Sequence, residues 1–141
     1  MEKTNVKYNA YIKILEEELR PAMGCTEPIA LAYAAAVARK VLGELPDKVV
    51  IGASGSIIKN VKSVIVPNTD HLKGIPAAAA AGIVAGDPDK ELEVIASVEK
   101  EAIAEMKEFL KKTPISVEHV DNGFTFEIVV TLYKGEAWSR V

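Results

Sequence analysis

The chain has 141 residues, of which 49% are hydrophobic and 26% are charged, and its formal net charge is −3. This length and composition fit one globular domain with a sizeable core. The chain has no basic block that would indicate nucleic-acid binding and no apolar run long enough to span a membrane. The start, Met1–Asn5, is unlike a signal peptide, and the single cysteine excludes an internal disulfide. We therefore expect a cytoplasmic protein.

Two helices are expected in the first third of the chain. Apolar side chains recur at helical spacing from about Val6 to Arg20, where Pro21 would end an amphipathic helix. The second helix is expected from about Glu27 to Leu42 and has almost no polar side. A helix that is apolar all round is normally buried. We therefore expect an alanine-rich central helix.

The segment between these helices holds the only cysteine. Thr26 is a plausible N-cap for the second helix, and Pro28 is tolerated in its first turn. Cys25 would then lie just outside the helix N-terminus, where unpaired N–H groups and the helix dipole favour a thiolate. The alternative is a small buried apolar residue. The proline, glycine and capping residues around Cys25 favour the reactive thiol.

The middle of the chain predicts a β-hairpin over about 48–66, because two β-branched runs flank a segment rich in glycine and serine. That segment matches no phosphate-loop motif, so a bulge or bend is the better interpretation. Lys59 and Asn60 end this segment. Such residues are more often turn residues, but this pair of donors can also hold a carboxylate. The next loop, Pro67–Gly74, contains His71, for which solvent exposure is the simpler explanation.

The second half predicts an alanine-rich helix over 77–85, then a polar helix or helix pair over 90–112. Two further runs, 115–120 and 124–133, flank Asn122-Gly123, which is a strong hairpin signal. The expected fold is therefore α+β: a mostly antiparallel sheet from two hairpins, about 48–66 and 115–133, packed by four to five helices. We expect one domain over 1–141, the N-terminal fragment of a longer chain.

Residues Pro21–Pro28, PAMGCTEP, resemble the opening motif of the L-cysteine desulfidase family. That family is related to the α-chain of the iron–sulfur L-serine dehydratases. Supporting matches follow in order: Ser54-Gly55 running into Ile58-Lys59-Asn60, then Val66-Pro67, then Gly74 and the alanine-rich helix. The resemblance covers essentially all of this chain but only the N-terminal part of the family's longer proteins.

The resemblance implies a lyase that uses no pyridoxal phosphate and β-eliminates L-cysteine to pyruvate, ammonia and sulfide. It implies a [4Fe–4S] cluster held by three cysteines in the full-length protein, with Cys25 matching the first. Lys59 and Asn60 would then orient the substrate carboxylate, while Thr26 and Glu27 would contact cluster or substrate. The implied partners are a small amino acid and the remaining C-terminal region of the chain, with a homo-oligomer also compatible.

Three alternatives stay open, because the other two cluster cysteines are absent and this chain alone should hold no cluster. The first is an inactive interaction or oligomerisation domain of the same fold. The second is an L-serine dehydratase-like deaminase. The third is a cysteine-nucleophile hydrolase, which would need His71 or His119 beside Cys25.

Overall fold

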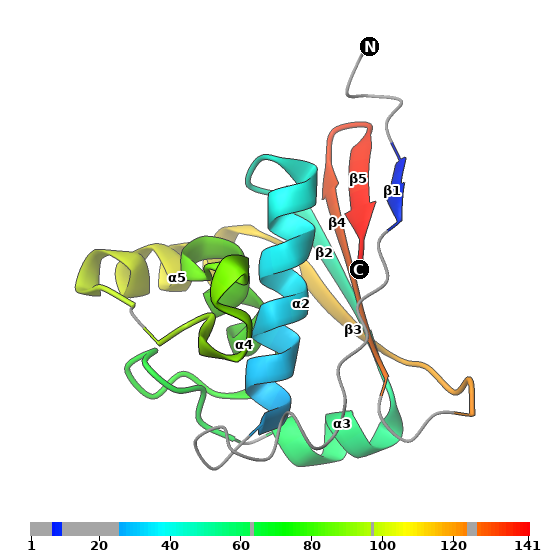
Figure 1. Cartoon of the computed structure of the whole chain (residues 1–141), viewed down its shortest axis with the longest axis horizontal. Coiled ribbons are helices and arrows are strands. Elements are labelled where there is room, and N and C mark those ends of the chain that lie inside the picture. The colour runs from blue at the N-terminus through cyan, green and yellow to red at the C-terminus, as the bar shows by residue number, and fades with distance from the viewer. Residues whose placement is uncertain (1–6, 10–25, 63, 97, 124–126) are drawn as a thin grey trace.

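A computed structural model describes residues 7–9, 26–62, 64–96, 98–123 and 127–141 of the chain. The α+β class expected from the sequence is confirmed (Figure 1). In chain order the elements are β1 (Lys7–Asn9), α2 (Thr26–Leu42), β2 (Lys48–Ala53), α3 (Gly55–Val61), α4 (Gly74–Ala85), the 3-10 helix η2 (Pro88–Glu93), α5 (Lys100–Lys112), β3 (Ile115–His119), β4 (Ile128–Lys134) and β5 (Ala137–Arg140). No helix in these ranges is long and apolar enough to cross a membrane.

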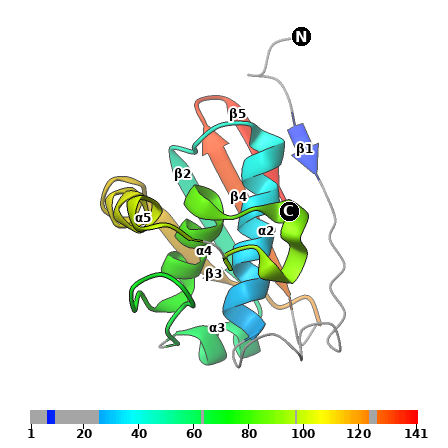
Figure 2. The same ribbon diagram turned by 60° about the vertical axis from the view of Figure 1, so that its left-hand side comes forward.

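The strands form one mixed five-stranded sheet in the order β1-β5-β4-β2-β3. Strand β4 is antiparallel to both β2 and β5, whereas the β2–β3 and β1–β5 pairs are parallel. Helices α2 and α4 pack against one face of this sheet, and α5 packs on α4 (Figures 1 and 2). Val49, Ile51 and Leu132 point into that layer and are buried, as expected for a sheet with one packed face.

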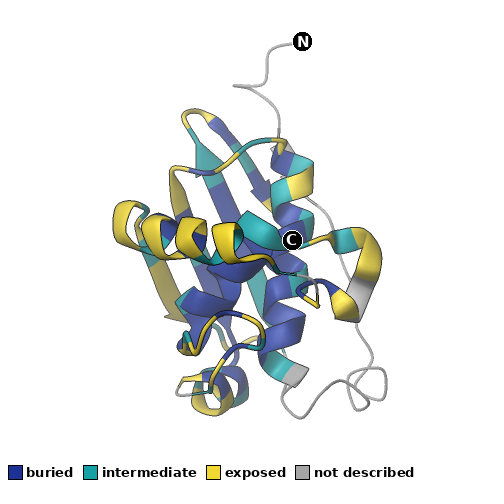
Figure 3. Cartoon of the chain, turned by 90° about the vertical axis from the view of Figure 1, so that its left-hand side faces the viewer, coloured by how far each residue is buried: buried dark blue, intermediate teal, exposed yellow. Residues whose placement is uncertain are grey.

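Helix α2 is the buried alanine-rich helix that the sequence predicts. Ala30, Leu31, Ala32, Ala35 and Ala38 are all fully inaccessible to solvent, and the helix runs through the interior (Figure 3). It packs against α4, whose small side chains are equally buried. The small side chains let the two backbones approach closely, and the two helices together form the centre of the core.

Both expected hairpins are wrong, although the class is right. The segment 55–61 is helix α3, and the expected second strand up to residue 66 is reduced to a single bridge between Ile65 and Lys73. Strands β3 and β4 do not pair with each other, because β2 lies between them. The Asn122-Gly123 turn therefore connects strands on either side of β2 and closes no tight hairpin.

The expected N-terminal helix is wrong where the structure describes it. Residues Lys7–Asn9 form β1, which pairs in parallel with β5 at Trp138–Arg140. The remainder of that prediction, from residue 10, lies outside the described residues. Strand β5 was not expected either, and its Ser139 hydroxyl donates a 2.8 Å hydrogen bond to the carbonyl of Ala38 in α2.

Gly82 in α4 is required by the helix contact. A Cβ at this position would lie 2.1 Å from the carbonyl oxygen of Ala32, so either the helices must separate or the backbone must shift. We predict that Gly82→Ala lowers the free energy of unfolding by about 3 kcal/mol in urea denaturation.

The matched control is Gly55→Ala, the same change at the first residue of α3. Its Cβ would meet only the His119 ring, at 3.4 Å and beyond, so little loss of stability is expected. Equal unfolding free energies for the two variants would show that α2 and α4 do not depend on this close approach.

Candidate functional site

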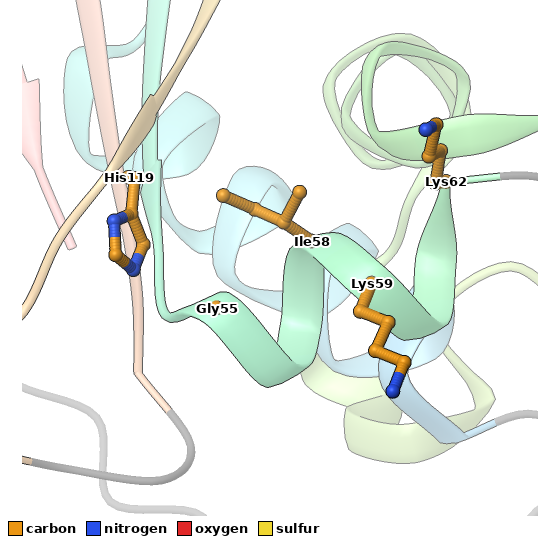
Figure 4. Close-up of a pocket in the computed structure, with 5 residues that line it drawn as sticks. All are labelled: Gly55, Ile58, Lys59, Lys62 and His119. Carbon is orange, nitrogen blue, oxygen red and sulfur yellow. The ribbon is translucent and has the colours of Figure 1, made fainter.

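The site begins where two parallel strands end together. Ala53 at the end of β2 is paired with His119 at the end of β3, and the chain leaves β2 through Ser54 into α3. The carboxyl ends of parallel strands are a common position for ligand sites in sheet proteins. Here they border an open cleft of about 650 Å³, lined by Gly55, Ile58, Lys59, Lys62 and His119 (Figure 4).

The cleft is basic at its rim and apolar at its floor. Ile58 points across it toward His119, whereas the side chains of Lys59 and Lys62 leave α3 in opposite directions, neither toward His119 (Figure 4). None of the lining residues is acidic. The local charge therefore favours an anionic group near α3.

A hydrogen bond joins this region to the start of α2. The Asn60 side-chain amide of α3 donates to a carboxylate oxygen of Glu27 in the first turn of α2, at 3.3 Å. Two of the residues predicted from the sequence to form a site, 33 positions apart, thus meet directly, and a third, Lys59, is the neighbour of Asn60. Thr26 is the first residue of α2, and Cys25, which precedes it, lies outside the described residues.

Ser54 fixes the path of the chain between β2 and α3. Its backbone N–H donates to the carbonyl of Glu127 at 2.9 Å, and its hydroxyl accepts the Glu127 backbone N–H at 3.1 Å. These two bonds tie the start of α3 to the segment before β4. The cleft wall formed by α3 is therefore anchored to the β4 side of β2.

His71 lies elsewhere, in the loop between α3 and α4. Asn68, Asp70 and His71 all have positive φ, which is uncommon for residues other than glycine. The Asn68 amide donates to the Ile95 carbonyl at 2.9 Å and secures this loop. His71 is 82% exposed and its described ionic neighbour is Asp70, at 3.8 Å, so solvent exposure is the better explanation of this histidine.

The described residues gather no group of three or more metal-ligating side chains. The chain has one cysteine, whereas an iron–sulfur cluster is normally held by three or four thiolates. The residues present do not fit a cluster by themselves. Any cluster at Cys25 would need thiolates from outside this chain.

Sequence reasoning missed two basic residues of the cleft. Lys62 follows the Lys59-Asn60 pair by one helical turn, but this spacing is informative only once 55–61 is known to be helical. His119 falls in the run 115–120, which the sequence predicts to be a hairpin strand. It reaches the cleft because β3 pairs with β2 across more than 60 residues, which no local pattern indicates.

Comparison with known proteins identifies relatives that share one name. The chain is 52% identical, over all its 141 residues, to a UPF0597 protein of Desulfitobacterium hafniense (strain Y51), of which it covers 33%. It is 48% identical over 125 residues to a UPF0597 protein of Treponema denticola, covering 89% of this chain and 29% of the relative. A UPF0597 protein of Shewanella oneidensis is 42% identical over 96% of this chain and 32% of its own length.

The chain thus spans about a third of the length of the curated relatives it matches. No family model matches the chain, and no solved structure matches it. These findings correct the resemblance drawn from the Pro21–Pro28 motif: the similar proteins are UPF0597 proteins, and none of these relatives is named as an L-cysteine desulfidase or an L-serine dehydratase.

An ion pair between Lys107 and Asp70 links α5 to the loop that contains His71, and it shifts the pKa of the Asp70 carboxyl. Lys107 of α5 donates a hydrogen bond to Asp70 at 3.1 Å, and this bond and the ammonium charge lower the pKa of the Asp70 carboxyl below its ordinary value. A lowered folded-state pKa contributes stability above the unfolded pKa, and that contribution is lost as pH falls through the folded value.

We therefore predict that Lys107→Gln raises the pKa of Asp70 toward its ordinary value, measured by NMR titration of the side-chain carboxyl. Lys111→Gln, which removes an exposed lysine from the same helix, should leave that pKa unchanged. An identical Asp70 titration curve in Lys107→Gln and the wild type would exclude the ion pair in solution.

Proposed function

We propose that this chain supplies the substrate-binding part of a lyase that β-eliminates a small α-amino acid, with L-cysteine as the first substrate to test. The observation that carries the proposal is the Glu27–Asn60 hydrogen bond. It places an acidic side chain from α2 beside the basic end of α3. An α-amino acid carries one ammonium and one carboxylate close together, and such a pair of side chains complements both.

The roles follow from the donors and acceptors present. Lys59 provides an ammonium for the substrate carboxylate. Asn60 holds Glu27 with one of its two amide N–H groups, and Glu27 offers its carboxylate to the substrate ammonium. Together these residues would orient the Cα–H and Cβ–S bonds of L-cysteine relative to each other, which is the positioning that elimination requires.

The chemistry balances without an oxidant. Removal of the α-proton by a base and departure of the β-sulfur as sulfide leave aminoacrylate, which hydrolyses to pyruvate and ammonia. Cys25, one position before α2, would supply one thiolate to a cluster whose other ligands come from the rest of a longer protein. A cytoplasmic location would keep this thiol reduced.

The test is a titration of the ¹⁵N-labelled chain, with reducing agent, using L-cysteine, cysteamine and 3-mercaptopropionate. Cysteamine lacks the carboxylate and 3-mercaptopropionate lacks the ammonium. We predict that L-cysteine shifts the amide signals of α3 and binds at least about tenfold more tightly than either analogue, the loss typical of one charged contact. Equal affinity for all three, or no shifts in α3, would contradict the proposal.

Single substitutions separate the two contacts. Lys59→Gln should bring the affinity for L-cysteine down to that for cysteamine, and Glu27→Gln should bring it down to that for 3-mercaptopropionate. Lys100→Gln removes an exposed lysine at the start of α5 and should leave all three affinities unchanged. Retention of full L-cysteine affinity in Lys59→Gln would remove this residue from the site.

A further inference from the structure

The sheet has two unequal edges. Strand β1 forms one edge with three residues, whereas β3 forms the other with five, Ile115–His119. Ser116, Val117, Glu118 and His119 are all exposed. Strand edges of this length normally carry a proline, charged side chains (lysine above all) or a bulge that prevents pairing with another strand. Strand β3 has no proline, lysine or bulge within its bounds, and its one charged residue is Glu118.

The register shows which backbone groups of β3 are open. In the parallel pair with β2, the Val49 N–H donates to the Pro114 carbonyl, and the Val120 N–H donates to the Ala53 carbonyl. Backbone groups of alternate residues in a strand point to the same side. Ser116 and Glu118 therefore face β2, and Ile115, Val117 and His119 direct their N–H and C=O groups to the open side.

Within the described part of the chain, no other strand lies beside these groups and no backbone hydrogen bond outside the ladders reaches them. Val117 is one of the large hydrophobic residues exposed to solvent, at 38%. Three alternate residues with open donors and acceptors and an apolar side chain at the centre are what a partner strand needs for β-augmentation.

We propose that β3 pairs with a β-strand from the part of the UPF0597 proteins that this chain does not match. The relatives carry about two thirds of their length beyond the matched region, and the Desulfitobacterium hafniense relative matches this chain throughout, β3 included. A strand supplied from the same polypeptide forms at high effective concentration, without the translational entropy cost of a second molecule. The inference is independent of the proposed lyase activity.

The test compares amide hydrogen exchange, by NMR, in this chain and in the full-length Desulfitobacterium hafniense relative. In this chain the amides of Val117 and His119 should exchange quickly, and those of Ser116 and Glu118 slowly, since only the latter face β2. In the full-length relative the residues aligned with Val117 and His119 should exchange at least 100-fold more slowly. Fast exchange at those positions in the relative would overturn the proposal.

Self-association is distinguished by concentration. If Val117 and His119 are already protected in this chain, and the protection grows with protein concentration, the partner is a second copy and the proposal is wrong. Protection independent of concentration in this chain alone would overturn it as well, because the edge would then be covered from within.

Matched substitutions give a second readout. Proline at position 117 removes an N–H that bonds no residue of β2, so Val117→Pro should lower the melting temperature of this chain only slightly. The same substitution at the aligned position of the full-length relative should lower its melting temperature by several degrees more, while threonine there should have little effect. Equal losses in the two proteins would contradict the added strand.

Discussion

The close approach of α2 and α4 is the constraint on which the rest of the structure depends. Gly82 leaves no room for a Cβ against the Ala32 carbonyl, and the neighbouring residues in both helices are small and buried. Dispersion forces and burial of apolar surface act over the whole length of this contact. The pair forms one layer over the sheet, and α2 is held with its first turn at the end where β2 and β3 finish (Figure 1).

That position decides the geometry of the site. Because α2 starts beside α3, Glu27 reaches Asn60. The two segments that hold the candidate site residues, the start of α2 and the end of α3, therefore meet at one place. Ser54 ties the start of α3 to Glu127, just before β4, through two hydrogen bonds, which hold the basic helix at the end of the sheet. A rigid scaffold that presents side chains from short, well-anchored elements is the arrangement that binding sites in small domains commonly use.

The sequence predicts best what is local. The all-apolar helix over 27–42 and the alanine-rich helix near 77–85 follow from composition and periodicity. The sequence also singles out Lys59, Asn60 and Glu27 as candidate site residues, and the structure joins Asn60 to Glu27 by a hydrogen bond. Helix α3 was missed because Ile57 and Ile58 follow glycine and serine, a pattern that favours a strand and a bend. Seven residues are too few for helical periodicity to show against it.

The sheet was mispaired for a different reason. Asn122-Gly123 is a hairpin signal only if its flanking strands are neighbours, and here β2 pairs with both of them. Pairing between residues near 50 and near 117 depends on burial of the whole helix layer, and no local sequence pattern in either segment indicates it. The position of His119 beside the cleft and the open edge of β3 both follow from that pairing, so neither could be predicted from the sequence alone.

Cys25 offers the most direct test of the central claim, that the start of α2 and the basic end of α3 form one ligand site. Because it is the only cysteine of the chain, its alkylation by iodoacetamide reports on one position. The measurement is the alkylation rate with and without saturating L-serine, which has no thiol to compete for the reagent. The account predicts a slower rate with L-serine in the wild type and no slowing in Lys59→Gln. An alkylation rate that saturating L-serine leaves unchanged in the wild type would contradict it.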